Sequence, residues 1–252
     1  MARLEGRAVI VTGAAQGIGA AYAKAMAAEG AKLALCDVVS CESVVEIIRQ
    51  AGGQAFSTHC DVTDAAQVGE LVARTERDYG GVQGLVNNAA LFKGIPMTRF
   101  ENITSADFDR IMTVNVRGSF ECIKAVLPVM KRQGYGKIVN VASGTFFKGT
   151  PMMAAYVTSK GAVVGLTRCI AREVGEFGIR INCIAPGLTM SEAVRDNPEW
   201  ADAMISANTA SRAIRREEEP ADLTGTMTFL ISPDSDFMTG QTILVDGGSA
   251  MH

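Results

Sequence analysis

Short apolar runs alternate with longer helical segments along most of the chain. The apolar runs predict seven strands, at residues 7–12, 32–36, 54–59, 84–86, 137–141, 179–184 and 242–245. The segments between them predict helices over residues 17–29, 43–51, 65–79, 105–132, 155–177 and 220–231, with an irregular stretch at 188–216. Strands that are apolar on both faces and alternate with helices are typical of a parallel sheet covered on both sides.

This alternation predicts an α/β protein with three layers, in which a doubly wound parallel sheet of the Rossmann type lies between two layers of helices. Right-handed crossovers give its seven strands the order 3-2-1-4-5-6-7. No linker, repeat or low-complexity segment divides the sequence, so we expect residues 1–252 to form a single domain. The irregular stretch at about 188–216 is expected to form a lid over the substrate.

Composition and charge narrow the class of protein further. The 252 residues are 48% hydrophobic and 20% charged, as in an ordinary soluble protein, and the net charge of −3 is spread along the chain. This favours neither a nucleic-acid partner nor an anionic membrane. No signal-like start, membrane-length apolar run or zinc-binding Cys/His spacing occurs, so we expect a cytoplasmic protein without a metal.

A glycine-rich loop follows the first predicted strand and leads into the first predicted helix. In the run at residues 12–19, Gly13 permits a tight turn and Gly17 permits close approach of a pyrophosphate to the backbone. Gly19 allows the helix to pack against the sheet. Free N–H groups at the helix N-terminus favour the phosphates, so the loop predicts a dinucleotide site rather than a plain turn.

Asp37 ends the second predicted strand and indicates which dinucleotide binds. A carboxylate here can accept hydrogen bonds from the ribose hydroxyls and would repel a 2′-phosphate. Its neighbours Val38 and Val39 and the loop residues Ala14 and Ala15 supply no cation for such a phosphate. NAD is therefore predicted in preference to NADP. The alternative role for Asp37 is a helix cap, although Ser40 is also placed for that role.

Tyr156 and Lys160 lie four residues apart near the start of a predicted helix, which places them on one face. Ser143 follows the strand at 137–141, so it should reach the same crevice at the carboxyl edge of the sheet. Interconversion of an alcohol and a ketone needs a group that exchanges the hydroxyl proton. Tyr156 fits this role if the Lys160 ammonium lowers its pKa, while Ser143 binds the substrate oxygen. Asn115, in the long predicted helix, is a candidate to bind a water that links Lys160 to solvent.

Together these motifs resemble the short-chain dehydrogenase/reductase family, over nearly the whole length. The matching segments are TGxxxGxG at residues 12–19, Asp61-Val62, Asn87-Asn88-Ala89-Ala90, Asn115, Ser143, Tyr156-Val157-Thr158-Ser159-Lys160, Arg180-Ile181-Asn182, Pro186-Gly187, Thr239-Gly240-Gln241 and Val245-Asp246-Gly247-Gly248. The resemblance implies that Asn115, Ser143, Tyr156 and Lys160 form a catalytic tetrad. It also implies a homotetramer, built through paired long helices and the last strand.

The predicted coenzyme-binding set combines the loop, Asp37 and the residues that the resemblance implies. Its members are Gly13, Gln16, Gly17, Ile18, Gly19, Asp37, Val38, Asp61, Val62, Asn88, Ala89, Ala90, Tyr156, Lys160, Pro186, Gly187, Leu188, Thr189 and Ser191. Ala90 departs from the family, which usually has Gly there, and its methyl group is expected to narrow the coenzyme side of the pocket.

The residues expected at the substrate pocket are mainly apolar and aromatic. They are Ala90, Leu91, Phe92, Thr145, Phe146, Phe147, Met152, Met153, Leu188 and Met190, with part of the lid. They favour a hydrophobic, cyclic or aromatic secondary alcohol or its ketone, although ordinary core packing is the alternative for the Phe and Met residues. Arg195 and Arg212 of the lid are expected to be solvated rather than to bind a carboxylate.

Two local resemblances bear on the substrate. The run at residues 145–151 is similar to pyridoxal 4-dehydrogenases, and the overall pattern with the terminal His252 is similar to aryl-alcohol and alicyclic alcohol dehydrogenases. The main hypothesis is an NAD-dependent alcohol dehydrogenase. Two alternatives stay open: a biosynthetic ketone reductase similar to 3-oxoacyl-carrier-protein reductases, and a non-catalytic dinucleotide sensor or scaffold.

Overall fold

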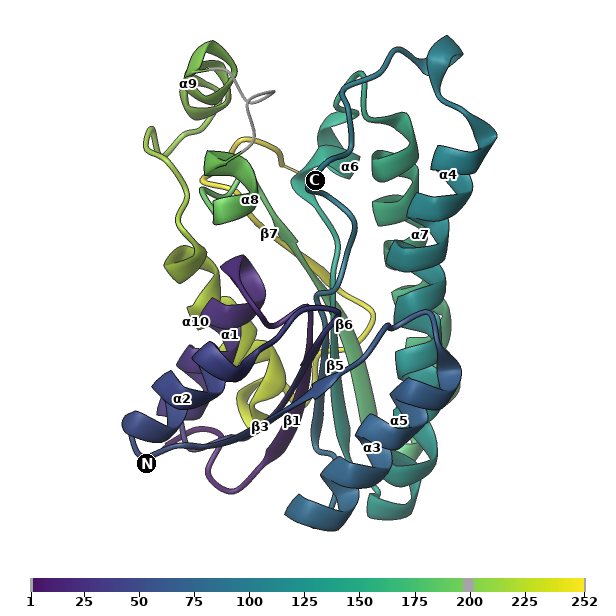
Figure 1. Ribbon diagram of the computed structural model, residues 1–252, viewed down its shortest axis with the longest axis vertical. Helices are drawn as coiled ribbons and strands as arrows, with labels where there is room; N and C mark the ends of the chain where they lie inside the picture. The colour runs from purple at the N-terminus through teal and green to yellow at the C-terminus, as the bar shows by residue number, and fades with distance from the viewer. Residues whose placement is uncertain (1, 197–201, 252) are drawn as a thin grey trace.

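A parallel sheet of seven strands forms the centre of the molecule (Figure 1). The computed structural model describes residues 2–196 and 202–251, so His252 lies outside the described residues. The strands are β1 (Ala8–Thr12), β2 (Lys32–Asp37), β3 (Gln54–His59), β4 (Gly84–Asn87), β5 (Gly136–Val141), β6 (Ile179–Pro186) and β7 (Thr242–Val245). Their order is β3-β2-β1-β4-β5-β6-β7, and every neighbouring pair is parallel. The predicted topology is therefore confirmed.

The sheet is buried on both faces because successive apolar side chains on a strand point to opposite sides. In β1, Val9 and Val11 belong to one hydrophobic cluster, whereas Ile10 belongs to the other. The pattern repeats in β2, where Leu33 shares the first cluster and Ala34 the second. This double burial explains why the strands read as continuous apolar runs rather than as an alternating pattern.

Helices cover the two faces of the sheet in two layers (Figure 1). α1, α2 and α10 pack on one face, and α3, α5 and α7 pack on the other. The α-helices are α1 (Gly17–Ala28), α2 (Glu42–Gln50), α3 (Ala65–Tyr79), α4 (Ser105–Met112), α5 (Gly118–Gln133), α6 (Gly144–Lys148), α7 (Ala154–Val174), α8 (Glu192–Arg195), α9 (Asp202–Ala210) and α10 (Pro220–Ile231). The short helices are η1 (Phe100–Asn102), η2 (Thr113–Arg117), η3 (Gly175–Phe177) and η4 (Pro233–Ser235).

The structure corrects the predicted helices in two places. The single helix expected at 105–132 is divided into α4 and α5 by the π-helical turn η2. A π turn accommodates one extra residue within a helix. The composition of the segment stays that of a helix, so the sequence predicted one continuous helix. The irregular stretch at 188–216 contains α8 and α9, although its residues 197–201 lie outside the described part of the chain.

The loops that follow the strands meet at the carboxyl edge of the sheet, and α8 and α9 lie above this edge (Figure 1). α6 also belongs to this edge, since it starts directly after β5, and it was not predicted because it has only five residues. Within residues 2–196 and 202–251, none of the helices has both the length and the apolar character that crossing a bilayer requires. The loops that follow the strands thus gather at one edge of the sheet.

Candidate active site

A cavity of about 810 Å³ opens at the carboxyl edge of the sheet. Every residue of the predicted coenzyme-binding set lines it, from Gly13 in the first loop to Ser191 before α8. Ser143, Tyr156 and Lys160 lie at the same cavity. In parallel α/β sheets, ligands bind in the crevice outside the carboxyl ends of the strands, which is where these residues meet.

The glycine loop leaves space for an anion beside the backbone. Gly13 and Gly17 adopt left-handed conformations, with φ of +64° and +58°. A Cβ on Gly19 would lie 2.1 Å from the carbonyl oxygen of Gly13, so no larger residue fits there without movement of the backbone. The first turn of α1 is not capped by the Gln16 side chain, which leaves N–H groups directed at the cavity. These features fit the diphosphate of a dinucleotide.

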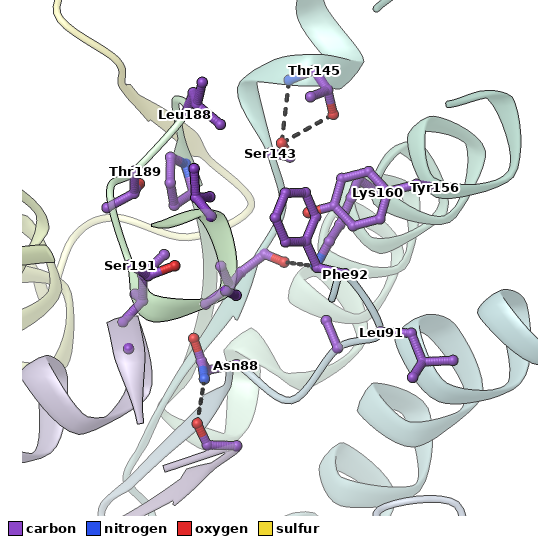
Figure 2. Close-up of a pocket in the computed structure, with 18 of the residues that line it drawn as sticks. Asn88, Leu91, Phe92, Ser143, Thr145, Tyr156, Lys160, Leu188, Thr189 and Ser191 are labelled. Atoms are coloured by element: carbon purple, nitrogen blue, oxygen red, sulfur yellow. Dashed lines mark hydrogen bonds between the residues drawn. The ribbon is translucent and has the colours of Figure 1, made fainter. Parts of the chain in front are cut away.

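Asn88 holds the same loop from the end of β4. Its side-chain Nδ2 donates to the carbonyl oxygens of Thr12 at 3.1 Å and Gly13 at 2.8 Å. Figure 2 shows the Asn88 side chain directed at this loop, with one of these bonds drawn. The Thr12 hydroxyl in turn accepts hydrogen bonds from the backbone N–H groups of Asn88 and Ala89. The two loops that line this side of the cavity are therefore fixed to each other before any ligand binds.

Asp37 lies at the end of the cavity next to the glycine loop. Its carboxylate accepts hydrogen bonds from the N–H groups of Ala15 at 3.2 Å and Val38 at 2.7 Å. The carboxylate thus lies at the junction of β2 and the glycine loop. It does not cap α2, which begins at Glu42, and the Ser40 hydroxyl accepts from the N–H of Glu42 instead. The alternative role of Asp37 as a helix cap is therefore wrong.

Ser143, Tyr156 and Lys160 converge on the other side of the cavity (Figure 2). The Ser143 hydroxyl caps α6 by accepting from the Thr145 N–H, and its contact with the Tyr156 hydroxyl favours the phenolate. The Lys160 ammonium donates to the carbonyl oxygen of Val141 at 2.8 Å and lies 5.6 Å from the centre of the Tyr156 ring. All three side chains are at most 8% exposed, so their charges and protons are poorly solvated.

The pKa of Tyr156 differs from the expectation that Lys160 lowers it. Burial raises the pKa of Tyr156 to about 12, and the hydrogen bond with Ser143 opposes this rise only in part. Burial also lowers the pKa of Lys160 to about 8. Desolvation therefore dominates the pKa of both groups, and the expected lowering of the Tyr156 pKa by Lys160 is not found. Tyr156 carries its proton at neutral pH, in the form that can donate to a carbonyl oxygen.

Asn115 lies beneath the cavity rather than on its wall. It is 1% exposed within η2, where its Oδ1 accepts from the N–H of Leu91 at 2.7 Å. Its Nδ2 donates to the Ser159 hydroxyl at 3.0 Å. Because Ser159 precedes Lys160, Asn115 connects the loop after β4 to the helix that carries Tyr156 and Lys160. These two hydrogen bonds show that Asn115 positions the segments that it connects. Its predicted hydrogen bond to a water stays a prediction.

The predicted substrate residues divide into two groups. Phe92 and Thr145 line the cavity, and the Phe92 ring lies 5.4 Å from the Tyr156 ring (Figure 2). The residues Ala90, Leu91, Met152 and Leu188 also line it, whereas Phe146, Phe147, Met153 and Met190 do not.

The four residues that do not reach the cavity pack elsewhere. Phe147 packs against a buried cluster around Ala142 and Val163, and Phe146 lies edge-on to Phe147. Met153 lines a small separate cavity of about 60 Å³ behind Tyr156, and Met190 is 6% exposed. Ordinary packing therefore accounts for Phe147 and Met190, whereas Phe146 is 39% exposed and Met153 borders the small cavity.

Sequence reasoning missed several residues of the cavity wall. They are Met97, Val114, Lys148, Thr150 and Pro151. A helical pattern over 144–148 could have identified Lys148, because residues three and four positions apart share a face and Gly144 and Thr145 also line the cavity. Met97 comes from the loop between β4 and η1 and Val114 from η2, and no local pattern indicates which side chains of such segments face a cavity.

The structure corrects the expectation that both arginines of the predicted lid are solvated. Arg212 is 4% exposed and donates to the carbonyl oxygens of Leu188 and Arg216, each at 2.7 Å. Its guanidinium lies 3.9 Å from the carboxylate of Glu218, which is 5% exposed and accepts from the Thr189 hydroxyl. The two ends of the segment 188–216 are joined by the hydrogen bonds that Arg212 and Glu218 form with Leu188 and Thr189.

Arg195, in contrast, has a half-exposed side chain that pairs with Glu219 at 2.6 Å. Its position therefore agrees with the expectation that it is solvated. Among the described residues there is no group of three or more His, Cys, Asp or Glu side chains that could hold a metal ion.

The fold and the cavity define a dinucleotide-dependent oxidoreductase of the Rossmann type, and the comparisons with known proteins name the family. A family model described as enoyl-(acyl carrier protein) reductase matches residues 13–250. The chain belongs to the short-chain dehydrogenase/reductase family. Its resemblance to this family in sequence is therefore confirmed.

Individual relatives carry several names within this family. The chain is 35% identical to levodione reductase of Leifsonia aquatica, covering 98% of this chain and 96% of that protein. The crystal structure of levodione reductase has a TM-score of 0.91, with 34% identity over 99% of this chain and 100% of that one. Galactitol 2-dehydrogenase of Agrobacterium fabrum is 36% identical, covering 99% of each. A 3-oxoacyl-[acyl-carrier-protein] reductase of Staphylococcus epidermidis is 34% identical, covering 97% and 99%.

Proposed function

We propose that this protein is an NAD-dependent oxidoreductase that interconverts a hydrophobic secondary alcohol, cyclic or aromatic, and its ketone. The observation that carries the proposal is the convergence of Ser143, Tyr156 and Lys160 at one cavity with the glycine loop and Asp37. Relatives that are named as reductases and dehydrogenases support the reaction class.

In the proposed mechanism, a side chain of the protein donates and accepts the proton of the substrate oxygen. The Tyr156 hydroxyl donates its proton to the carbonyl oxygen during reduction and accepts it back during oxidation. The Ser143 hydroxyl donates a hydrogen bond to the same substrate oxygen and stabilises the charge that develops there. Lys160, fixed by the Val141 carbonyl, places a cation beside the phenolate when the proton leaves.

The residues around the cavity fit a nicotinamide dinucleotide. The glycine loop would hold the diphosphate and Asp37 the adenosine ribose, while Pro186, Gly187 and Leu188 would border the nicotinamide. When bound, this coenzyme supplies or accepts the hydride. Asp37 supports NAD rather than NADP, since its carboxylate would repel a 2′-phosphate at this position.

The substrate would bind between Phe92 and the segment 188–216, which we propose closes as a lid. α9 of this segment lines the cavity with Met204, Ala207 and Asn208, and these side chains come within reach of a bound substrate. Family membership and the half-exposed aromatic side chains Phe108 of α4 and Phe120 of α5 support a homotetramer built through the long helices.

The direct test is a panel of secondary alcohols assayed with NAD and NADP by absorbance of the reduced coenzyme. We expect turnover of cyclic and aromatic alcohols with NAD, and slower turnover with NADP. Tight NAD binding without turnover of any alcohol would instead indicate a dinucleotide sensor. A strong preference for NADPH and for 3-oxoacyl thioesters would indicate the second candidate, a biosynthetic ketone reductase, which the Staphylococcus epidermidis relative favours.

A further inference from the structure

The five-residue helix α6 presents one polar face to the cavity. Thr145 and Lys148, three residues apart, both line the cavity together with Gly144. The other two residues of the helix, Phe146 and Phe147, pack against each other with ring centres 5.1 Å apart. Phe146 also lies against Gly161 of α7, so the aromatic pair fixes the orientation of the helix. Lys148 is therefore directed to the cavity side by the packing of its neighbours.

The Lys148 ammonium has hydroxyl and not carboxylate partners. It donates to the Ser249 hydroxyl, which also hydrogen-bonds the Ser211 hydroxyl at the end of the predicted lid. Among the described residues, Lys148 forms no ion pair within 4.0 Å. The carboxylate of Asp246 raises the pKa of Lys148. This carboxylate is occupied by hydrogen bonds that it accepts from the backbone N–H groups of Gly248, Ser249 and Ala250.

The surroundings of Lys148 make its charge available to a ligand. Lys148 is an exposed residue that lines the cavity, and partial desolvation at the cavity wall lowers the pKa of its ammonium. The neighbouring walls are apolar, with Phe92, Met152, Leu188 and Met204 facing the same space. The acidic residues that line the cavity lie elsewhere, Asp37 and Asp61 near the glycine loop and β2 and Glu192 near Gly17. The buried Glu218 and Asp246 are outside the lining but close enough to raise the pKa of Lys148.

We propose that the substrate carries a carboxylate, remote from the reacting carbon, and that Lys148 binds this group. The proposal rests on the proposed alcohol–ketone chemistry at Ser143 and Tyr156. Ser143 caps the start of α6 and Lys148 ends it, five residues later, which separates them by about 7.5 Å along the helix axis. One end of the substrate lies at the proton-transferring hydroxyls, and its anionic end lies at Lys148.

The test compares 4-hydroxycyclohexanecarboxylate with its methyl ester as substrates of the wild type, Lys148→Gln and Lys148→Arg. We expect the wild type to favour the carboxylate in kcat/KM by about tenfold, as a charge-assisted hydrogen bond implies. Lys148→Gln should abolish this preference and Lys148→Arg should keep most of it. Lys124→Gln, on α5 and outside the cavity, is the matched control and should keep the wild-type ratio.

A binding measurement separates failure of this inference from failure of the proposed reaction. Calorimetric titration of cyclohexanecarboxylate and cyclohexanecarboxamide, with NADH present, requires no turnover. About tenfold weaker binding of the carboxylate to Lys148→Gln, with little change for the amide, supports the site even if neither alcohol is oxidised. An unchanged ratio of the two substrates, or equal carboxylate affinity in wild type and Lys148→Gln, overturns it.

Discussion

The two sides of the cavity, which we propose hold the coenzyme and the substrate, are built in different ways. At the coenzyme side, the loops after β1, β2 and β4 are held by hydrogen bonds between backbone atoms and the side chains of Asn88, Thr12 and Asp37. At the substrate side, the wall consists of the short helices α6 and α9 and the loop before α7. The first side is fixed by a few motif residues, whereas the second depends on how small helices pack.

This difference predicts which substitutions affect every reaction and which change the choice of substrate. A diphosphate binds backbone N–H groups, so the residues around it must leave the backbone accessible. A substrate meets side chains, and a change of one side chain alters the wall without disturbing the sheet. We therefore expect substitutions on the coenzyme side to affect all reactions of the enzyme. Substitutions on the substrate side should change which alcohol reacts.

The largest effect is expected at Tyr156, where the two sides meet. Tyr156→Phe removes the hydroxyl that we propose exchanges the proton, so kcat/KM should fall by about 10²–10⁴, while the Kd of NADH should change little. Steady-state kinetics and coenzyme fluorescence measure the two quantities. Tyr135→Phe is the matched control, because its hydroxyl contacts Asp236 away from the cavity. Near-normal turnover by Tyr156→Phe would show that another group handles the proton.

The next largest effect is expected at the buried pair of the substrate side. Arg212→Met leaves the Glu218 carboxylate buried without its cation, which should lower the free energy of unfolding by about 3–5 kcal/mol. Urea denaturation measures this change. Arg195→Met, which breaks the exposed pair with Glu219, should cost about 1 kcal/mol or less. If the two variants lose equal stability, the buried pair does not fix the predicted lid.

A smaller change in stability is expected in the glycine loop. Gly19→Ala places a methyl group against the Gly13 carbonyl and the Asn88 side chain, so we expect a loss of about 1–3 kcal/mol and weaker NADH binding. Gly69→Ala in α3, where the added methyl group meets no atom within 4 Å, should stabilise the protein by about 0.5–1 kcal/mol. Thermal unfolding and coenzyme titration distinguish the two variants. Unchanged NADH affinity in Gly19→Ala would contradict the role of the loop.

The smallest expected effect concerns coenzyme choice. Asp37→Asn keeps the size of the side chain but removes the charge that repels a 2′-phosphate, so the affinity for NADP relative to NAD should rise about tenfold. Fluorescence titration with both reduced coenzymes measures this ratio. Asp78→Asn on α3, outside the cavity, should leave it unchanged. A constant ratio in Asp37→Asn would mean that other residues select the coenzyme.

The fold and the coenzyme side were predictable because their signals are local and repeated. The strands of a doubly buried sheet are continuous apolar runs, and the topology follows from right-handed crossovers. The glycine loop is recognisable because Gly13, Gly17 and Gly19 stand at fixed positions between a strand and a helix. The backbone at these positions is constrained by sterics, which the type of residue reveals directly.

The substrate side was predictable only in part because composition does not show which face of a short helix is buried. Phe146 and Phe147 were expected in the cavity because they are apolar, yet they pack behind α6 and leave Lys148 on the cavity wall. Arg212 was expected in solvent because it is charged, yet it is buried by contacts with Glu218 and with the distant Leu188 carbonyl. Such contacts arise from tertiary packing rather than from any local pattern.

The π-helical turn η2 sets the phase between the two helices that it joins. Each residue of an α-helix turns the chain by about 100°, so adding or removing one residue rotates all later side chains around the axis. The wide turn absorbs one residue, so that α4 faces α7 while α5 faces α3. Asn115 lies inside this turn and reaches both Leu91 and Ser159. The number of residues in η2 is therefore as strictly determined as their identity. We expect a deletion of one residue in η2 to separate the loop after β4 from the helix that carries Tyr156.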